Sequence, residues 1–193
     1  MIAYKGFSPE LKSCFGDGKK ENCCFHIGET KTVEKSKTVS CGFHCCENPF
    51  DCLTYYSLDG KNRFFRVEAG GSIDEDASNR IACTEITLLE ELNAVAFAVE
   101  GMRYIINHPD REGWQQEHGS VRVKEGKAEV AAKDCIAIAR GRNPMVKGPE
   151  GSILGLIVED MERAIVDCKL FVQTAEMADK WCTVGRDRKV MEV

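Results

Sequence analysis

Residues 41–56 read CGFHCCENPFDCLTYY, and this stretch decides how we interpret the rest of the chain. It contains four of the eleven cysteines and half of the four tyrosines. We expect the end of a strand at residues 41–44, a turn at Asn48-Pro49 and a short helix that starts near Pro49. Proline suits the first helical turn, because the N–H that it lacks would have no partner there.

A polar segment connects this strand to the helix. We expect a loop on which His44, Cys45, Cys46 and Glu47 converge on a ligand, since binding residues are often carried by loops. The alternative is a buried turn, because cysteine is among the most buried residue types and packs as a small hydrophobe. The sequence leaves both interpretations open.

The composition is that of an ordinary globular protein. Hydrophobic residues make up 43% of the chain and charged residues 30%. The formal net charge is −5, so no overall positive field is present to hold a nucleic-acid backbone. This argues against a general nucleic-acid binder. The length of 193 residues allows one domain or two small ones.

The N-terminal residues, MIAYKGF, have neither a basic region nor an apolar core, so we expect no signal peptide. No apolar run approaches the roughly 18 residues that a membrane-spanning helix needs. Without a secretion signal, the cysteines are expected to be reduced thiols rather than a disulfide framework. We therefore expect a protein that contacts no membrane and is cytoplasmic in the host cell.

Strand-like segments, separated by glycine-rich or polar turns, recur over the first 86 residues. They predict a β-rich N-terminal domain at residues 1–86. A helical pattern follows. Thr87-Leu-Leu-Glu90 fits a capping box, and Asn107-His-Pro109 is a stop signal, so we expect a linking helix at residues 87–108. Its expected apolar stripe consists of Leu88, Leu92, Val95, Val99, Met102 and Ile106.

Three short segments beyond residue 109 share a pattern of a small residue followed by a strand-length apolar run. Aligned on Ser120, Cys135 and Ser152, they recur after 15 and then 17 residues. A repeat too small to bury its own face must stack on its neighbours, which predicts a short β-roll or solenoid over residues 109–193. The alternative is a plain antiparallel meander.

The segment at residues 159–172 is ambiguous. Val166, Cys168, Leu170 and Val172 alternate as in a strand, whereas Met161, Ile165, Cys168 and Val172 have the three- to four-residue spacing of a helix. Residues 181–184 and 189–193 predict a closing hairpin around Gly185.

Several motifs together resemble an uncharacterised domain found in phage and prophage proteins. They are YKGF at 4–7, IGET at 27–30, GFHxCExPxD at 42–51 with Tyr55-Tyr56, RFFRVE at 63–68, and the segment 81–86. The later repeats are similar to the β-roll coils of trimeric autotransporter adhesin heads. The resemblance implies a phage origin and oligomerisation, and it implies no reaction. The chain departs from the pattern in its short repeat array, its helix and its additional cysteines at positions 23, 24, 41 and 45.

Two pairs, Cys23-x-x-His26 and Cys41-x-x-His44, make up a set of ligands that tetrahedral zinc accepts. Zinc signatures usually begin with a tight Cys-x-x-Cys, which this set lacks. We therefore expect no structural zinc and no other cofactor, although the sequence alone leaves zinc open.

Two catalytic interpretations also remain open. Gly42-Phe43-His44 with Tyr55-Tyr56 is similar in style to an ADP-ribosyltransferase site, for which Glu85 would be the late acidic residue. Alternatively, Cys45 or Cys46 could act as a nucleophile with His44, although neighbours in sequence rarely face each other correctly.

The sequence thus predicts an α+β protein with a β-rich domain, one long helix and a C-terminal β-roll. The leading hypothesis is a non-catalytic, homo-oligomeric binding protein of phage or prophage origin that antagonises a host defence protein or sequesters a signalling nucleotide. The alternatives are an ADP-ribosyltransferase-like enzyme and a virion accessory protein. Arginines would suit the phosphates of a nucleotide. The candidate ligand-binding residues are His44, Glu47, Tyr56, Arg63 and Arg66.

Overall fold

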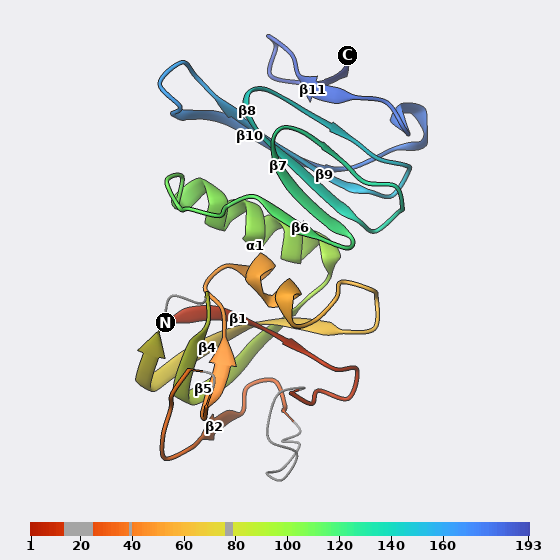
Figure 1. Cartoon of the computed structure of the whole chain (residues 1–193). Coiled ribbons are helices and arrows are strands. Elements are labelled where there is room, and N and C mark those ends of the chain that lie inside the picture. Colours follow the sequence, from red (N-terminus) through yellow and green to blue (C-terminus); the bar gives the residue numbers. More distant parts are fainter. Residues whose placement is uncertain (14–24, 39, 76–78) are drawn as a thin grey trace. The chain divides into compact units, whose positions relative to one another are not determined.

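The computed structural model describes residues 1–13, 25–38, 40–75 and 79–193. The chain divides into two compact units, Met1–Asn93 and Ala94–Val193, each built on one sheet (Figure 1). Strands account for 48% of the structure and helices for 13%. The protein is therefore mostly β with two sheets, and the predicted α+β class with one long helix is wrong.

The first unit contains a five-stranded sheet in which every strand pair is antiparallel. The order is β1-β4-β5-β2, and β3 also pairs with β5. A 3₁₀ helix, η1, follows β3. The bounds are β1 Ile2–Phe7, β2 Thr30–Thr32, β3 Phe43–Cys45, η1 Pro49–Thr54, β4 Arg63–Glu75 and β5 Ile81–Leu92.

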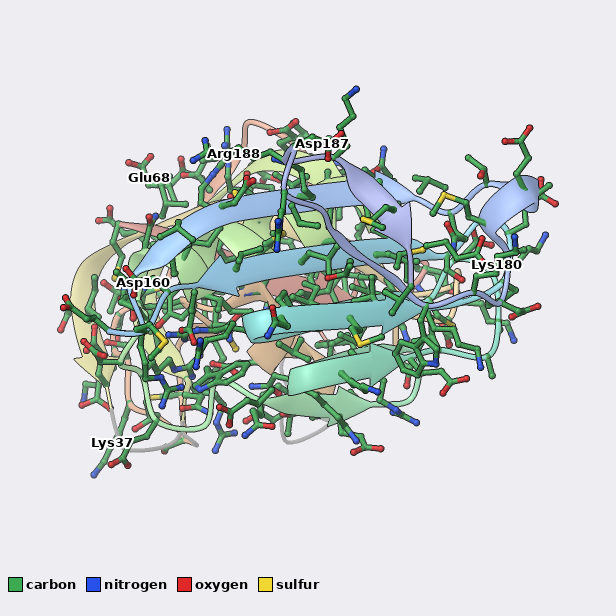
Figure 2. The ribbon with its side chains drawn as sticks, turned by 90° about the horizontal axis from the view of Figure 1, so that it is seen from above. Lys37, Glu68, Asp160, Lys180, Asp187 and Arg188 are labelled. Carbon is green, nitrogen blue, oxygen red and sulfur yellow. The ribbon has the colours of Figure 1, made fainter. Side chains whose placement is uncertain are left out.

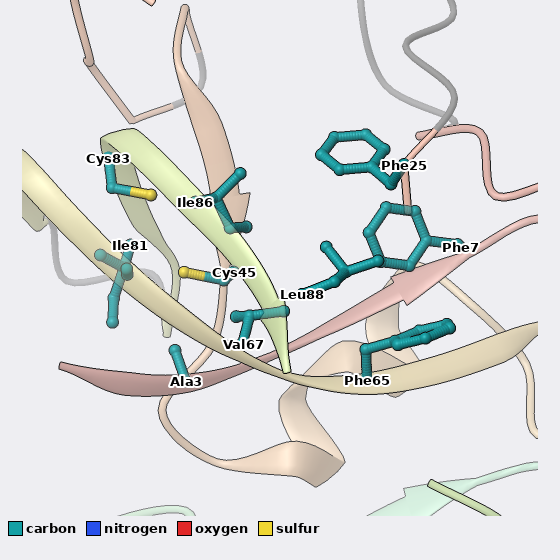
Figure 3. Close-up of a cluster of buried hydrophobic side chains, with 11 residues drawn as sticks. Ala3, Phe7, Phe25, Cys45, Phe65, Val67, Ile81, Cys83, Ile86 and Leu88 are labelled. Atoms are coloured by element: carbon teal, nitrogen blue, oxygen red, sulfur yellow. The ribbon is translucent and has the colours of Figure 1, made fainter. Parts of the chain in front are cut away.

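Alternate residues of these strands form the core of the first unit. Figure 3 shows the rings of Phe7, Phe25 and Phe65 at one end of this cluster and the sulfur atoms of Cys45 and Cys83 at the other. The rings of Phe7 and Phe65 meet edge to face at 5.5 Å, an arrangement that aromatic quadrupoles favour.

The long pair of strands β4 and β5 contains a bulge at Gly70 to Ile73. Gly71 has a φ of +69°, and a Cβ at this position would collide with the hydroxyl of Thr84. That hydroxyl instead accepts a hydrogen bond from the Ser72 N–H at 2.8 Å. Only glycine meets both requirements, so the bulge is specified by one residue and its cross-strand neighbour.

The predicted start of the linking helix at residues 87–108 is wrong, because residues 87–92 belong to β5. Ile86 and Leu88 are fully buried and the residue between them is not, which is the period of a strand. Thr87 pairs with both Glu68 and Thr30. Two neighbouring strands thus supply hydrogen-bond partners for the backbone groups that a capping box would have bonded within the helix.

The α-helix α1 spans Ala94–Asn107 and opens the second unit. Its buried face differs from the predicted stripe, since Val95 and Val99 are 42% and 36% exposed. The stripe was misplaced because two of its six members, Leu88 and Leu92, lie in a strand. The buried residues of α1 are Phe97, Ala98, Gly101, Met102 and Ile105.

The second unit contains a seven-stranded sheet. Figure 2 shows its strands side by side, with Asp187 and Arg188 at the turn between the last two. The bounds are β6 Gln116–His118, β7 Val121–Glu129, β8 Ile136–Lys147, β9 Ile153–Glu159, β10 Ile165–Val172, β11 Cys182–Val184 and β12 Val190–Glu192, with a 3₁₀ turn, η2, at Ala175–Met177.

Strands β7, β8 and β9 run parallel to one another. Val121 pairs with Ile136, and Ile136 pairs with Ile153, so the register repeats the offsets of 15 and 17 residues in the sequence. The antiparallel meander is therefore wrong for these segments. Pairing of β7 with β8 breaks after Glu125 and resumes at Lys127, where Gly126 and Gly141 have positive φ and the chain bends.

Two later segments are antiparallel. The ambiguous residues 159–172 contain the strand β10, which pairs with β9, so the helical alternative is wrong. The predicted closing hairpin is confirmed, because Cys182–Val184 pairs with Val190–Glu192.

One face of β8 and β9 contributes to the core of the second unit through Ala137, Ala139, Leu154 and Leu156. Their other face lies against α1. A Cβ at Gly155 would approach Met102 Sδ to 3.3 Å and an Ile138 side-chain carbon to 2.9 Å. The absence of a side chain at Gly155 therefore allows the helix to lie close to the sheet.

Substitutions in α1 test the corrected buried face. Ile105 is 1% exposed, so Ile105→Ala should lower the free energy of unfolding by about 2–5 kcal/mol. Val99→Ala should change it by less than about 0.5 kcal/mol, because this side chain is exposed. Urea unfolding of both variants measures the difference. A loss of unfolding free energy for Val99→Ala as large as that for Ile105→Ala would show that α1 also buries the face that carries Val99.

Candidate functional site

The stretch at residues 41–56 forms the predicted strand and helix. Strand β3 is followed by η1, which starts at Pro49, and the Asn48 side chain caps it by accepting a hydrogen bond from the Phe50 N–H at 3.1 Å. The predicted loop is shorter than expected. His44 and Cys45 belong to β3 and pair with Ala82 and Ile81 of β5.

Three of the predicted ligand-binding residues lie in and around this stretch. His44 is half-buried, and its carbonyl oxygen accepts a hydrogen bond from Lys5 Nζ at 2.6 Å. Glu47 is exposed. Tyr56 is buried, and its ring occupies the space that a side chain at Gly6 would take. Tyr56 therefore contributes mainly to packing in this conformation.

The two predicted arginines have acidic partners on β5. Arg63 donates two hydrogen bonds to Glu91, at 2.7 and 2.6 Å, and Arg66 lies 3.4 Å from Glu90. These side chains are partly exposed, so each pair contributes at most about 1 kcal/mol to stability. Because the two arginines are three residues apart on a strand, they point to opposite faces of the sheet and do not converge.

Thiols gather around a buried amine in the first unit. Lys5 is 5% exposed and lies on the core face of β1 between Ala3 and Phe7. A hydrogen bond that the Cys45 thiol donates to Cys83, together with burial, raises the pKa of Cys45 well above its usual value. A reactive cysteine needs a lowered pKa, because the thiolate is the nucleophile. The environment of Cys45 therefore favours a structural thiol.

The zinc hypothesis cannot be followed completely, because Cys23 lies outside the described residues. Within the described residues, no three His, Cys, Asp or Glu side chains are grouped so that they could hold a metal ion. Glu85, the acidic residue of the ADP-ribosyltransferase hypothesis, is exposed on β5.

A pocket of about 380 Å³ lies in the second unit, in the region for which the sequence predicted only a β-roll. It is formed by the loop after α1, by β8 and by the turn between β9 and β10. We call it the arginine–tryptophan pocket. It is lined by Pro109, Asp110, Arg111, Glu112, Gly113, Trp114, Arg140 and Arg163.

Arg140 is the fixed element of this pocket. Arg140 of β8 pairs with Ile157 of β9, which brings Glu159, two residues further along, onto the same face. Arg140 Nε donates a hydrogen bond to Glu159 Oε1 at 2.6 Å, and both side chains are 3% exposed. Its Nη1 donates to the Pro109 carbonyl at 2.7 Å, and the guanidinium lies 5.0 Å from the Trp114 ring centre.

The other two arginines of the pocket differ in their surroundings. Arg163 is 62% exposed and lies 3.8 Å from both Glu159 and Glu125, beyond hydrogen-bond distance. The guanidinium of Arg111 lies over the ring of Tyr104, 5.2 Å from its centre. The pocket thus combines one fixed cation, Arg140, with an exposed cation, Arg163, and with Arg111, which stacks on Tyr104.

Little in the sequence could have revealed this pocket, because its lining comes from three separate segments. The one local signal is Arg140, a charged residue that interrupts the otherwise small and apolar run Ile136–Gly141. A charge within a buried strand requires a partner, and this requirement points to a specific contact.

Comparison with known proteins identifies a family mainly for the first unit. A family model described as Domain of unknown function (DUF7666) matches residues 1–100. No curated protein and no solved structure matches the chain. In the described part of the chain, no helix has the length and hydrophobicity that crossing a bilayer requires. The arginine–tryptophan pocket lies outside the residues that the family model matches.

The buried amine of Lys5 gives a prediction about pH. Burial lowers the pKa of Lys5 below its usual 10.5, so the unfolded chain binds a proton that the folded chain releases over that interval. The contribution of Lys5 to the free energy of unfolding should therefore increase as the pH rises from the lowered pKa to 10.5. Lys5→Met removes this contribution.

The difference between the two unfolding curves reports Lys5 together with the effect of its charge on the neighbouring thiols. Urea unfolding of the wild-type protein and of Lys5→Met, from neutral pH to 10.5, measures it. Parallel curves over this range would mean that the amine is as solvated in the folded state as in the unfolded state.

Proposed function

Since the chain belongs to the family of the Domain of unknown function (DUF7666), to which no activity is assigned, we propose a function from its geometry. We propose a non-catalytic, homo-oligomeric binding protein that holds a small ligand bearing a phosphate or a carboxylate in the arginine–tryptophan pocket. The observation that carries the proposal is the buried, fully oriented guanidinium of Arg140 beside Trp114.

Preorganisation supports this proposal. Glu159 and the Pro109 carbonyl hold Arg140 in one orientation, so the loop after α1 and Trp114 are positioned before a ligand binds. A buried ion pair is often no more stabilising than apolar residues of the same volume. Its presence is therefore better explained by a role in positioning groups of the pocket than by stability alone.

The charges around the pocket favour a ligand with few negative charges. Glu159 neutralises Arg140, so Arg111 and Arg163 are the cations that would meet an anion. Their guanidinium groups can bind a phosphate or a carboxylate with two parallel hydrogen bonds. Asp110 and Glu112, also in the lining, oppose a polyanion. A monoanion or dianion therefore fits better than a nucleic acid.

The size and the aromatic wall favour a ligand of mononucleotide size. Pockets for small molecules range from about 300 to 1,000 Å³, and this one lies near the lower limit. Trp114 offers a flat apolar surface beside the arginines. In the phage setting that the sequence resemblance implies, such a protein would sequester a signalling nucleotide of the host. A host defence protein remains the other class of partner.

Arg163→Gln tests the pocket. With adenosine monophosphate as the probe, isothermal titration should show binding to the wild-type protein and a loss of about tenfold or more in affinity for the variant. The reason is that a hydrogen bond to a charged group contributes roughly 1.5–3 kcal/mol. The fluorescence of Trp114 should change on binding, and Trp114→Phe should abolish that change.

Arg186→Gln is the matched control, because it removes the same charge from an exposed residue of the second unit that does not line the pocket. Equal losses for Arg163→Gln and Arg186→Gln would indicate only general attraction of anions. No binding of adenosine monophosphate, pyrophosphate or citrate at millimolar concentration would contradict the proposed function.

A further inference from the structure

Strand β10 is an edge of the second sheet, since β9 is the only described strand that pairs with it. One face of β10 is apolar and open. Val166 and Val172 are 47% and 48% exposed, and Cys168, between them, is also exposed. An apolar edge strand of this length is a ready template for pairing with another strand.

The backbone of β10 shows which residues face outward. The N–H of Cys168 donates to its neighbour's carboxylate, Asp167 Oδ1, at 2.8 Å, rather than to β9. Because the direction of backbone groups alternates along the regular part of the strand, the N–H and C=O groups of Cys168, Leu170 and Val172 point away from β9; Val166 lies in a bulge between Ile165 and Asp167.

Two opposite charges lie on the other face of the same edge. Lys169 Nζ contacts Asp167 Oδ1 at 2.6 Å. The second oxygen, Asp167 Oδ2, is buried and has no hydrogen-bond partner among the described residues. The Asp167 carboxylate thus retains acceptor capacity within a single chain.

We propose that two copies of this chain associate through β10, with the two strands antiparallel and related by a twofold axis at Cys168. Cys168 then lies opposite Cys168 of the second copy, and the two residues exchange backbone hydrogen bonds. Asp167 lies opposite Lys169 of the second copy, and Val166 lies opposite Leu170. By symmetry each of these last two pairs occurs twice.

Charge selects this register over its neighbours. Moving the twofold axis by one residue to Asp167 or to Lys169 places two like charges opposite each other, which is destabilising. Moving it to Val166 places the axis at the bulge of β10, where the strand is irregular. Moving it to Leu170 leaves both charges of β10 without an opposite charge across the strands.

This interface would account for the homo-oligomer of the proposed function, with a second copy of the chain as the partner. It does not depend on ligand binding in the pocket. Forming it requires the Asp167 carboxylate to release the Cys168 N–H, which then bonds to the opposite strand. The carboxylate gains the partner's lysine in exchange. Val166, which is 47% exposed in a single chain, gains an apolar neighbour in Leu170 of the second copy.

Charge variants test the register. Asp167→Lys and Lys169→Asp each place two pairs of like charges across the strands, so each variant alone should be monomeric by light scattering at micromolar concentration. An equimolar mixture of the two variants should form a dimer, because every pair is then opposite in charge. If the two residues only stabilised the fold of each copy, mixing the variants would not restore the dimer.

Cross-linking tests the position of the axis. Opposite residues that exchange hydrogen bonds have Cα atoms about 5.5 Å apart, within the range of a disulfide. Diamide should therefore join two copies through Cys168: the two thiols lose two electrons and two protons, and diamide is reduced to the hydrazine. Cys168→Ser should abolish the cross-linked dimer, whereas Cys41→Ser, at another exposed cysteine, should not.

The outcomes separate the two proposals. A wild-type protein that binds adenosine monophosphate but remains monomeric would overturn the β10 interface and leave the pocket intact. A dimer that persists in both single charge variants, or a diamide cross-link that survives Cys168→Ser, would show that the copies associate through another surface. A dimer that binds no anion would contradict only the pocket.

Discussion

The ion pair between Arg140 and Glu159 is the interaction on which the arrangement of the second unit depends. It joins neighbouring strands, and through the Pro109 carbonyl and Trp114 it also fixes the loop that follows α1. Removing either partner would leave an uncompensated buried charge, which typically costs several kcal/mol. One pair of residues thus determines how the helix, the loop and the sheet meet, and the pocket is formed where they meet.

Local signals predicted those elements whose stability is local. The helix at Pro49 depends on proline and on the side chain of Asn48, both adjacent in sequence, and the closing hairpin depends on a short turn. The segment after Thr87 shows the limit of such signals. Its capping box and spacing are those of a helix, but β4 pairs with it as far as Leu92, and β2 pairs with Thr87 itself. Long-range pairing of this kind is not visible in a window of ten residues.

The site residues were harder to predict for the same reason. Arg63 and Arg66 look available in the sequence, but their partners, Glu91 and Glu90, are more than twenty residues away and become neighbours only when β5 pairs with β4. The arginine–tryptophan pocket combines a loop, a strand and a turn, none of which has a motif of its own. The offsets between the short repeats were the exception, because they reappear directly in the parallel register.

The parallel stacking of β7, β8 and β9 also bears on how proteins that contain such a second unit could vary in length. Each pass of the chain, meaning one parallel strand and the turn that follows it, makes the same kind of contact with the next pass. A further pass could therefore be inserted or lost without altering either neighbour. The ends are different: β6 and β10 are both antiparallel to the strands that they cover. Relatives should therefore differ here by whole passes of about 15–17 residues, the spacing of the parallel strands, while the two terminal strands stay constant.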